Sequence, residues 1–146
     1  MTPFYHYRKK VVGRTNRLIV ILLPLILVLT GCTFTREASV VVNDEQIRIT
    51  GIIYREKIPI EQLNQVFLAN TLPDITLRTN GLAIGATREG YFRSGSLGRI
   101  KLFLYSQSAP FLYIIYGDND KHVILNFRDK ERTLEVYEQL RVLVEK

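Results

Sequence analysis

The side chains able to carry chemistry in this 146-residue chain are few. Cys32 is the only cysteine, and the only histidines are His6 and His122. One thiol leaves no internal disulfide, and an ordinary zinc site needs a cluster of cysteine and histidine ligands that this sequence lacks. No metal site and no cofactor are therefore expected. Cys32 is the residue whose neighbours indicate a specific chemistry.

Catalytic constellations are equally sparse. A serine–histidine–aspartate triad would have to use His122, and no Gly-x-Ser-x-Gly elbow accompanies it, so a histidine on the surface of a strand is the favoured interpretation. Acid–base pairs such as Glu56 and Glu61 stay open, because a sequence does not reveal the distance between two carboxylates. Solvated surface is the simpler interpretation for both, and we predict no catalytic residue.

Two loops have some features of ligand-binding motifs. The glycine-rich stretch 81–98 has neither the P-loop spacing nor the dinucleotide-binding spacing, so we expect turns and bulges there. Asp118 and Asp120 open like a calcium loop, but His122 stands at the fifth position and Val123 replaces the required glycine. We therefore predict a hairpin turn between two strands.

The stretch before Cys32 is an apolar run from Leu18 to Leu29, interrupted by Pro24. Its roughly 12 residues would span about 18 Å as a helix, whereas a membrane-spanning helix needs about 20 apolar residues. Five basic residues and no acidic residue precede the run. Positive charge before a short apolar stretch is typical of a secretory signal, with the N-terminus held on the cytoplasmic side.

The run ends in Leu29-Thr30-Gly31-Cys32, which resembles the lipobox of bacterial lipoproteins. The resemblance implies that the Cys32 sulfur receives a diacylglycerol, that the chain is cut just before Cys32, and that the new amine is acylated. Two or more acyl chains anchor a protein stably, at about 0.8 kcal/mol per buried CH₂. The alternative is an uncleaved single-pass anchor. Both place the rest of the chain on the extracytoplasmic side of a cell membrane or envelope.

Domain organisation and charge follow from this interpretation. We predict a signal peptide or anchor over 1–31, a lipidated cysteine with a linker over 32–38, and one domain over 39–146, because about 100 residues bury a single core. The six-residue linker spans at most about 20 Å. The formal net charge is +6, but five of the 20 basic residues and none of the 14 acidic residues precede Cys32. The remaining 15 basic and 14 acidic residues give no reason to expect a nucleic-acid partner.

The domain is patterned as strands followed by a helix. The pair Asn80-Gly81 predicts a tight turn. The sequence also predicts a polar break at 55–57 and a short helical turn over 58–63. Asp129 is placed to cap a helix over 129–146, with Leu134, Tyr137, Leu140 and Val144 on its apolar face. Alternation and β-branched content predict strands over 39–42, 46–50, 51–54, 65–69, 75–79, 82–84, 91–93, 99–105, 111–116 and 122–127.

Three segments resemble the bacterial PH-like domain family: 58–60, 78–85 followed by Gly90-Tyr91-Phe92, and 124–127 with the helix after it. The resemblance implies a bent antiparallel β-barrel or sandwich of about seven strands closed by the C-terminal helix, and a binding or scaffolding role. Phosphoinositide-binding PH domains carry a basic first loop, whereas the turn Asn43-Asp44-Glu45 is acidic. That ligand is therefore not expected.

Basic residues gather once more among aromatic ones, at Arg88, Arg93, Arg99 and Lys101. They predict either a patch for anionic lipid headgroups or an ordinary solvated strand face. We expect a non-enzymatic binding module that engages an envelope protein or a peptide, for example by strand addition to an open sheet edge. The alternatives are a binder of anionic lipid or a small apolar ligand at the membrane surface, and a carboxylate-dependent hydrolase of the cell envelope.

Overall fold

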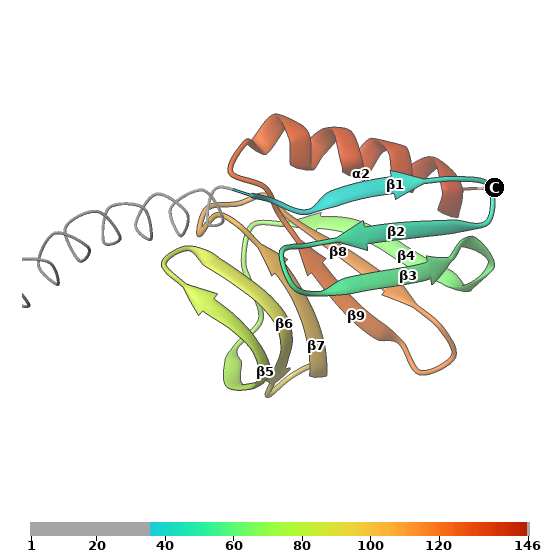
Figure 1. Ribbon diagram of the computed structural model, residues 1–146. Helices are drawn as coiled ribbons and strands as arrows, with labels where there is room; N and C mark the ends of the chain where they lie inside the picture. Colours follow the sequence, from blue (N-terminus) through green and yellow to red (C-terminus); the bar gives the residue numbers. More distant parts are fainter. Residues whose placement is uncertain (1–35, 146) are drawn as a thin grey trace, which may run out of the picture. The chain divides into compact units, whose positions relative to one another are not determined.

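The computed structural model describes residues 36–145 (Figure 1). The apolar run, the Leu29-Thr30-Gly31-Cys32 motif and most of the expected linker lie outside the described residues, so what the sequence predicts for them stays a prediction. In the part of the chain that is described, no helix is both long enough and apolar enough to cross a membrane.

A small antiparallel sheet opens the domain. It contains β1 (Ser39–Val42), β2 (Gln46–Thr50) and β3 (Arg55–Pro59) in that order. The turn after β1 is held by Asn43, whose side-chain oxygen accepts hydrogen bonds from the backbone N–H groups of Glu45 and Gln46 at 3.2 and 2.8 Å. Ile47 and Ile49 are fully buried and alternate with polar residues that are half-buried or exposed, as expected for a sheet with one face on the core.

A 3-10 turn, η1 (Ile60–Gln62), leads into a larger sheet of six strands. The strands lie in the order β4-β8-β9-β7-β6-β5. All neighbours pair antiparallel except β7 and β9, which are parallel. The bounds are β4 (Leu63–Ala69), β5 (Ile75–Ile84), β6 (Thr87–Ser94), β7 (Gly98–Leu104), β8 (Phe111–Tyr116) and β9 (Lys121–Leu125).

The helix α2 (Lys130–Val144) begins where the sequence predicts, with Asp129 accepting a hydrogen bond from the N–H of Glu131 at 3.1 Å. It packs against β4 and β8 through Thr133, Val136 and Leu140. The expected apolar face was wrong in part, since Leu134 is 42% and Val144 is 37% exposed. Thr133 takes the buried place because its hydroxyl oxygen accepts a hydrogen bond from the N–H of Phe127 at 3.1 Å, which a count of apolar residues does not detect.

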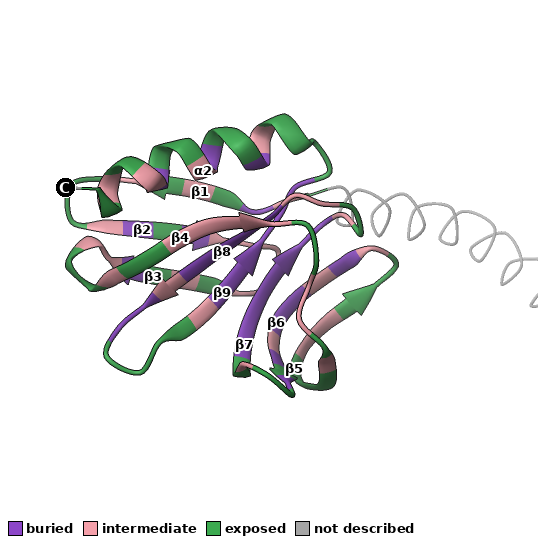
Figure 2. Ribbon diagram, turned by 180° about the vertical axis from the view of Figure 1, so that it is seen from behind, coloured by how far each residue is buried: buried purple, intermediate pink, exposed green. Residues whose placement is uncertain are grey.

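Apolar side chains fill both faces of the larger sheet. One cluster, which includes Ile47, Phe103 and Leu125, lies between this sheet, the small sheet and α2. The second cluster, which includes Leu102 and Phe111, covers the opposite face. The central strands β7, β8 and β9 are therefore buried almost throughout (Figure 2). This burial explains why β8 is a continuous run of apolar and aromatic residues and why β9 ends in one.

The prediction of a mainly β domain with one C-terminal helix is confirmed. The finer expectation was a bent antiparallel barrel or sandwich of about seven strands closed by the helix. The described residues instead form two sheets of three and six strands, which include one parallel pair and do not close into a barrel. The polar break expected at 55–57 is part of β3. The strand expected over 51–54 is the loop between β2 and β3.

The turn expected at Asn80-Gly81 was also wrong, because both residues lie inside β5. Gly81 pairs with Gly90 of β6, and a Cβ on Gly90 would stand 2.7 Å from the Gly81 Cα. The absence of a side chain on both glycines therefore allows β5 and β6 to approach each other closely at this point. The chain turns instead at Gly85, where φ is 57°.

Candidate functional site

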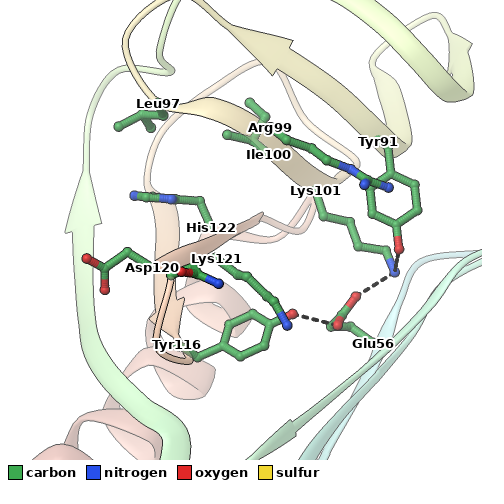
Figure 3. A pocket seen from close by; sticks show the side chains of 11 residues that line it. Glu56, Tyr91, Leu97, Arg99, Ile100, Lys101, Tyr116, Asp120, Lys121 and His122 are labelled. Atoms are coloured by element: carbon green, nitrogen blue, oxygen red, sulfur yellow. Dashed lines mark hydrogen bonds and ion pairs between the residues drawn. The ribbon is translucent and has the colours of Figure 1, made fainter.

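A cavity of about 390 Å³ lies beside β3 at one end of the larger sheet (Figure 3). Its lining comes from both sheets and from the turn between β8 and β9. The charged, aromatic and titratable side chains in it are Glu56 of β3, Tyr91 of β6, Arg99 and Lys101 of β7, Tyr116 of β8, Asp120 of the turn, and Lys121 and His122 of β9.

Strand register explains why three of these cations share one face. Lys101 of β7 is level with Val123 of β9 in the parallel pair. Since side chains alternate along a strand, Arg99, Lys101 and Lys121 all point to the side of the sheet that faces β3. On the strands that flank β7 and β9, Tyr91 of β6 lies opposite Lys101, and Tyr116 of β8 lies opposite Lys121.

Each cation rests against a tyrosine ring. The guanidinium carbon of Arg99 is 4.3 Å and the Nζ of Lys101 is 4.7 Å from the centre of the Tyr91 ring. The Nζ of Lys121 is 5.6 Å from the centre of the Tyr116 ring. These separations lie within the roughly 6 Å over which a cation is attracted to an aromatic face. The tyrosines therefore hold the cations in place without neutralising them.

Lys101 and Glu56 form the buried centre of the site. The Nζ of Lys101 is 2.5 Å from Glu56 Oε2 and also donates hydrogen bonds to the Arg55 carbonyl at 2.6 Å and to the Tyr91 hydroxyl at 3.3 Å. The Tyr116 hydroxyl donates to Glu56 Oε1 at 2.6 Å. Burial and this hydrogen bond to a carboxylate raise the pKa of Tyr116, so the hydroxyl stays protonated. Both oxygens of Glu56 are thus occupied.

The remaining charges of the cavity are less compensated. Arg99 and Lys121 are exposed, and neither forms an ion pair within residues 36–145. The carboxylate of Asp120 accepts a hydrogen bond from the side-chain amide of Asn64 at 3.0 Å. The cavity therefore holds three cations against two carboxylates that already have partners.

The structure divides the predicted basic patch. Arg93 pairs with Arg99 across β6 and β7, and Lys101 lies on the same face of the sheet but is buried and ion-paired. Arg88 lies on the opposite face, where it lines a small hollow with Leu104. Three of the four residues are thus brought together, and only two of these are exposed. Cys32 lies outside the described residues.

Sequence reasoning missed Tyr116 and Lys121 as parts of this site and considered Glu56 only as half of a carboxylate pair. Glu61, the other half, is exposed on η1 and does not line the cavity. Tyr116 and Lys121 meet the basic patch only because β9 pairs parallel with β7. No local sequence signal indicates such a pairing, which joins strands about 20 residues apart in the chain.

The predicted hairpin turn at Asp118 and Asp120 is confirmed, since it joins the antiparallel strands β8 and β9. His122 is half-buried on β9, as expected for a histidine on a strand. Among the residues that the structure describes, no three histidine, cysteine, aspartate or glutamate side chains are placed to share a metal ion.

Glu89 is a second buried carboxylate, and no prediction from the sequence included it. Its side chain accepts hydrogen bonds from the backbone N–H groups of Ile52, Ile53 and Tyr54 at 2.9, 2.8 and 2.6 Å, and from the Tyr105 hydroxyl at 3.0 Å. With four donors aimed at it, this carboxylate fixes the loop between β2 and β3 onto the larger sheet. Its role is structural.

Comparisons with protein-family models, with curated proteins and with solved structures found no match to this chain.

Proposed function

We propose that this chain is a lipid-anchored, extracytoplasmic protein whose β domain is a non-enzymatic interaction module. The module binds an extended segment of an envelope protein by adding it as a strand to the edge of the larger sheet. The observation that carries this proposal is β5, a ten-residue edge strand.

The outer edge of β5 is open. Within the described chain β5 pairs only with β6, and residues 76–80 are exposed. Natural proteins usually protect an edge with prolines, lysines, β-bulges or a short strand. The β5 strand contains no proline and a single charge, at Arg78, and its register shifts against β6 lie between residues 75 and 80. From Asn80 to Ile84 it pairs regularly with β6. Such an edge offers free N–H and C=O groups to an incoming strand.

Side chains along β5 supply apolar contact. Leu77 is 56% and Ile84 is 47% exposed. Exposed apolar side chains flanking unpaired backbone groups are the features with which sheet edges recognise extended peptides. The two carboxylates of the cavity already have hydrogen-bond partners, which favours a binding role over acid–base catalysis.

The location rests on the sequence motif that ends in Cys32, through the lipid that this motif implies. The described domain begins five residues later, at Glu37, which forms ion pairs with Arg128 and Arg132 at 3.5 and 3.3 Å. This contact supports a domain boundary soon after Cys32. We further propose that the domain belongs to the PH-like family, which segments 58–60, 78–85 and 124–127 resemble. Such membership is consistent with a binding module.

Photo-crosslinking in cells tests the proposal. A photoreactive residue in place of Arg78 of the full-length chain is expected to give a crosslink whose partner peptide maps to an extended segment. The crosslink should disappear in the variant L77K/I84K, which puts charge on the edge. It should persist in I53K/V142K, whose sites are similarly exposed but lie in a loop and on α2. Loss of the crosslink in Cys32→Ser would place the partner at the membrane.

Two results would contradict the proposal. One is a crosslink at Arg78 that survives L77K/I84K. The other is a photoreactive residue at Ile53 that captures the same partner with equal yield. Either result would mean that the edge of β5 does not select the partner.

A further inference from the structure

We propose that the cavity beside β3 binds a phosphate group, which Arg99 and Lys121 contact directly. The proposal does not depend on the edge of β5 or on the lipid at Cys32. It rests on three features of the described residues: uncompensated charge, cations held in fixed positions, and free hydrogen-bond donors.

Charge is the first feature. Glu56 is fully used by Lys101 and Tyr116, and Asp120 is bonded to Asn64. Arg99 and Lys121 have only tyrosine rings as partners within residues 36–145. A phosphate monoester carries about −1.5 to −2 charges at neutral pH. Asn64 is neutral, so Asp120 keeps its negative charge, and the three lysine and arginine side chains of the cavity exceed its two carboxylates by one positive charge. This excess attracts an anion such as a phosphate monoester.

Fixed geometry is the second feature. Ladder pairing places Lys121 next to Tyr116 and Lys101 next to Tyr91, and the Tyr91 ring also carries Arg99 at 4.3 Å. Figure 3 shows these side chains around one opening between β3 and the larger sheet. Side chains held in place before binding lose less conformational entropy when a ligand arrives. Two free lysines on a flat surface lack this advantage.

Hydrogen-bond donors are the third feature. Guanidinium groups match the oxygens of phosphate with two parallel N–H donors. The Tyr91 hydroxyl accepts a hydrogen bond from Lys101 at 3.3 Å, which leaves its own proton for a ligand oxygen. His122 also lines the cavity. A volume of about 390 Å³ lies in the range of small-molecule sites, so the phosphate can carry a small organic group.

Lys101 and Glu56 act as supports in this site. Their ion pair holds β3 against β7 and closes the inner end of the cavity. Because Glu56 already neutralises Lys101, the phosphate is expected to engage the outer cations. Arg93 lies next to Arg99 but does not line the cavity, which makes it the matched control.

The test uses the full chain in phosphatidylcholine nanodiscs at low salt, because such contacts weaken as ionic strength rises. Calorimetric titration with glycerol 3-phosphate, a free phosphate monoester, is expected to show saturable binding, and glycerol should show none. Arg99→Gln and Lys121→Gln should each weaken binding about tenfold. Arg93→Gln and L77K/I84K should change binding less than twofold.

A second arm distinguishes a lipid headgroup from a free phosphate. Nanodiscs that contain phosphatidylglycerol are compared with phosphatidylcholine alone by hydrogen exchange at residues 98–104 and 121–125. Slower exchange that depends on Arg99 and Lys121 would assign the phosphate to a lipid, whereas glycerol 3-phosphate binding without it would assign a free ligand. Binding in neither arm, or binding that Arg93→Gln weakens as much as Arg99→Gln, would overturn the proposal.

Discussion

Lys101 of β7 and Glu56 of β3 form the ion pair that joins the two sheets, with the Nζ 2.5 Å from Oε2. Both side chains are largely buried, with 7% and 17% of their surface exposed. The pair lies between the Tyr91 hydroxyl on one side and the Tyr116 hydroxyl on the other. The β3 strand is thus attached to β7 through Lys101 and to β8 through Tyr116, and Tyr91 of β6 contacts the same lysine.

Lys101→Met is expected to destabilise the domain by about 3 kcal/mol, because it leaves the Glu56 carboxylate buried without its counter-ion. Urea unfolding followed by circular dichroism measures the change. Adding Glu56→Gln to Lys101→Met should recover at least half of the loss, because the uncompensated charge is removed. Arg141→Met, which breaks exposed pairs with Glu138 and Glu145, should cost much less, because solvent screens exposed ion pairs. Equal losses for the buried and the exposed pair would contradict this account.

Alkaline pH should unfold the domain through its buried tyrosines. Burial is the largest cause of the raised pKa of Tyr105, followed by the charge of Glu89 and its hydrogen bond. Burial is also the largest cause of the raised pKa of Tyr116, followed by its hydrogen bond to Glu56. A raised folded-state pKa means that stability is complete below the unfolded pKa of about 10 and is lost as pH rises above it. Each such tyrosine lowers the free energy of unfolding by about 1.4 kcal/mol per pH unit there.

Urea unfolding between pH 7 and pH 11.5 measures this slope. Tyr116→Phe should lower the free energy of unfolding at pH 7, because Glu56 loses a hydrogen-bond donor. Above pH 10 it should also reduce the loss of this free energy per pH unit by the contribution of one tyrosine. A spectroscopic titration at 295 nm should show buried tyrosines ionising only together with unfolding. A slope above pH 10 that Tyr116→Phe and Tyr105→Phe leave unchanged would contradict the assignment.

The contact between β5 and β6 should tolerate no side chain at Gly90. Its φ of 114° is unfavourable for other residues, and a Cβ there would stand 2.6 Å from the Asn80 carbonyl oxygen and 2.7 Å from the Gly81 Cα. We expect Gly90→Ala to cost about 3 kcal/mol in thermal or urea unfolding. Gly85→Asn is the control, because no atom lies within 4 Å and asparagine tolerates the φ of 57°. A similar cost at both positions would show that close strand approach is not what requires Gly90.

These residues also show how far the sequence leads. Local patterns predicted β2, β8 and the capped start of α2, because alternation, apolar runs and Asp129 act within a few residues. They misplaced the turn at Asn80-Gly81, because the reason for Gly81 is its partner Gly90 across the sheet. The polar segment 55–57 was taken as a break for the same reason. Its Glu56 is explained by Lys101, 45 residues away in sequence.

The candidate site was predictable only in part. Arg99 and Lys101 stand out locally, because basic and aromatic residues alternate there. Their companions Tyr116 and Lys121 come from strands that reach the patch through the parallel pairing of β7 with β9. The charge state of the site depends on Glu56 from the other sheet. Long-range pairing decides both features, and hydrophobic periodicity carries no information about it.

Gly51 and Glu89 provide the sharpest test of how the two sheets are joined. A Cβ on Gly51 would overlap Glu89 Oε1. That carboxylate cannot withdraw without losing the hydrogen bonds that it accepts from three backbone N–H groups. Gly51→Ala should therefore cost about 2–3 kcal/mol in urea unfolding. Glu89→Ala should cost at least as much, because it leaves buried donors without partners. In the double variant the two losses should overlap by at least 1 kcal/mol, because the methyl group enters the space that the carboxylate has vacated. Strict additivity would mean that Gly51 is required for its backbone conformation and not for the approach of Glu89.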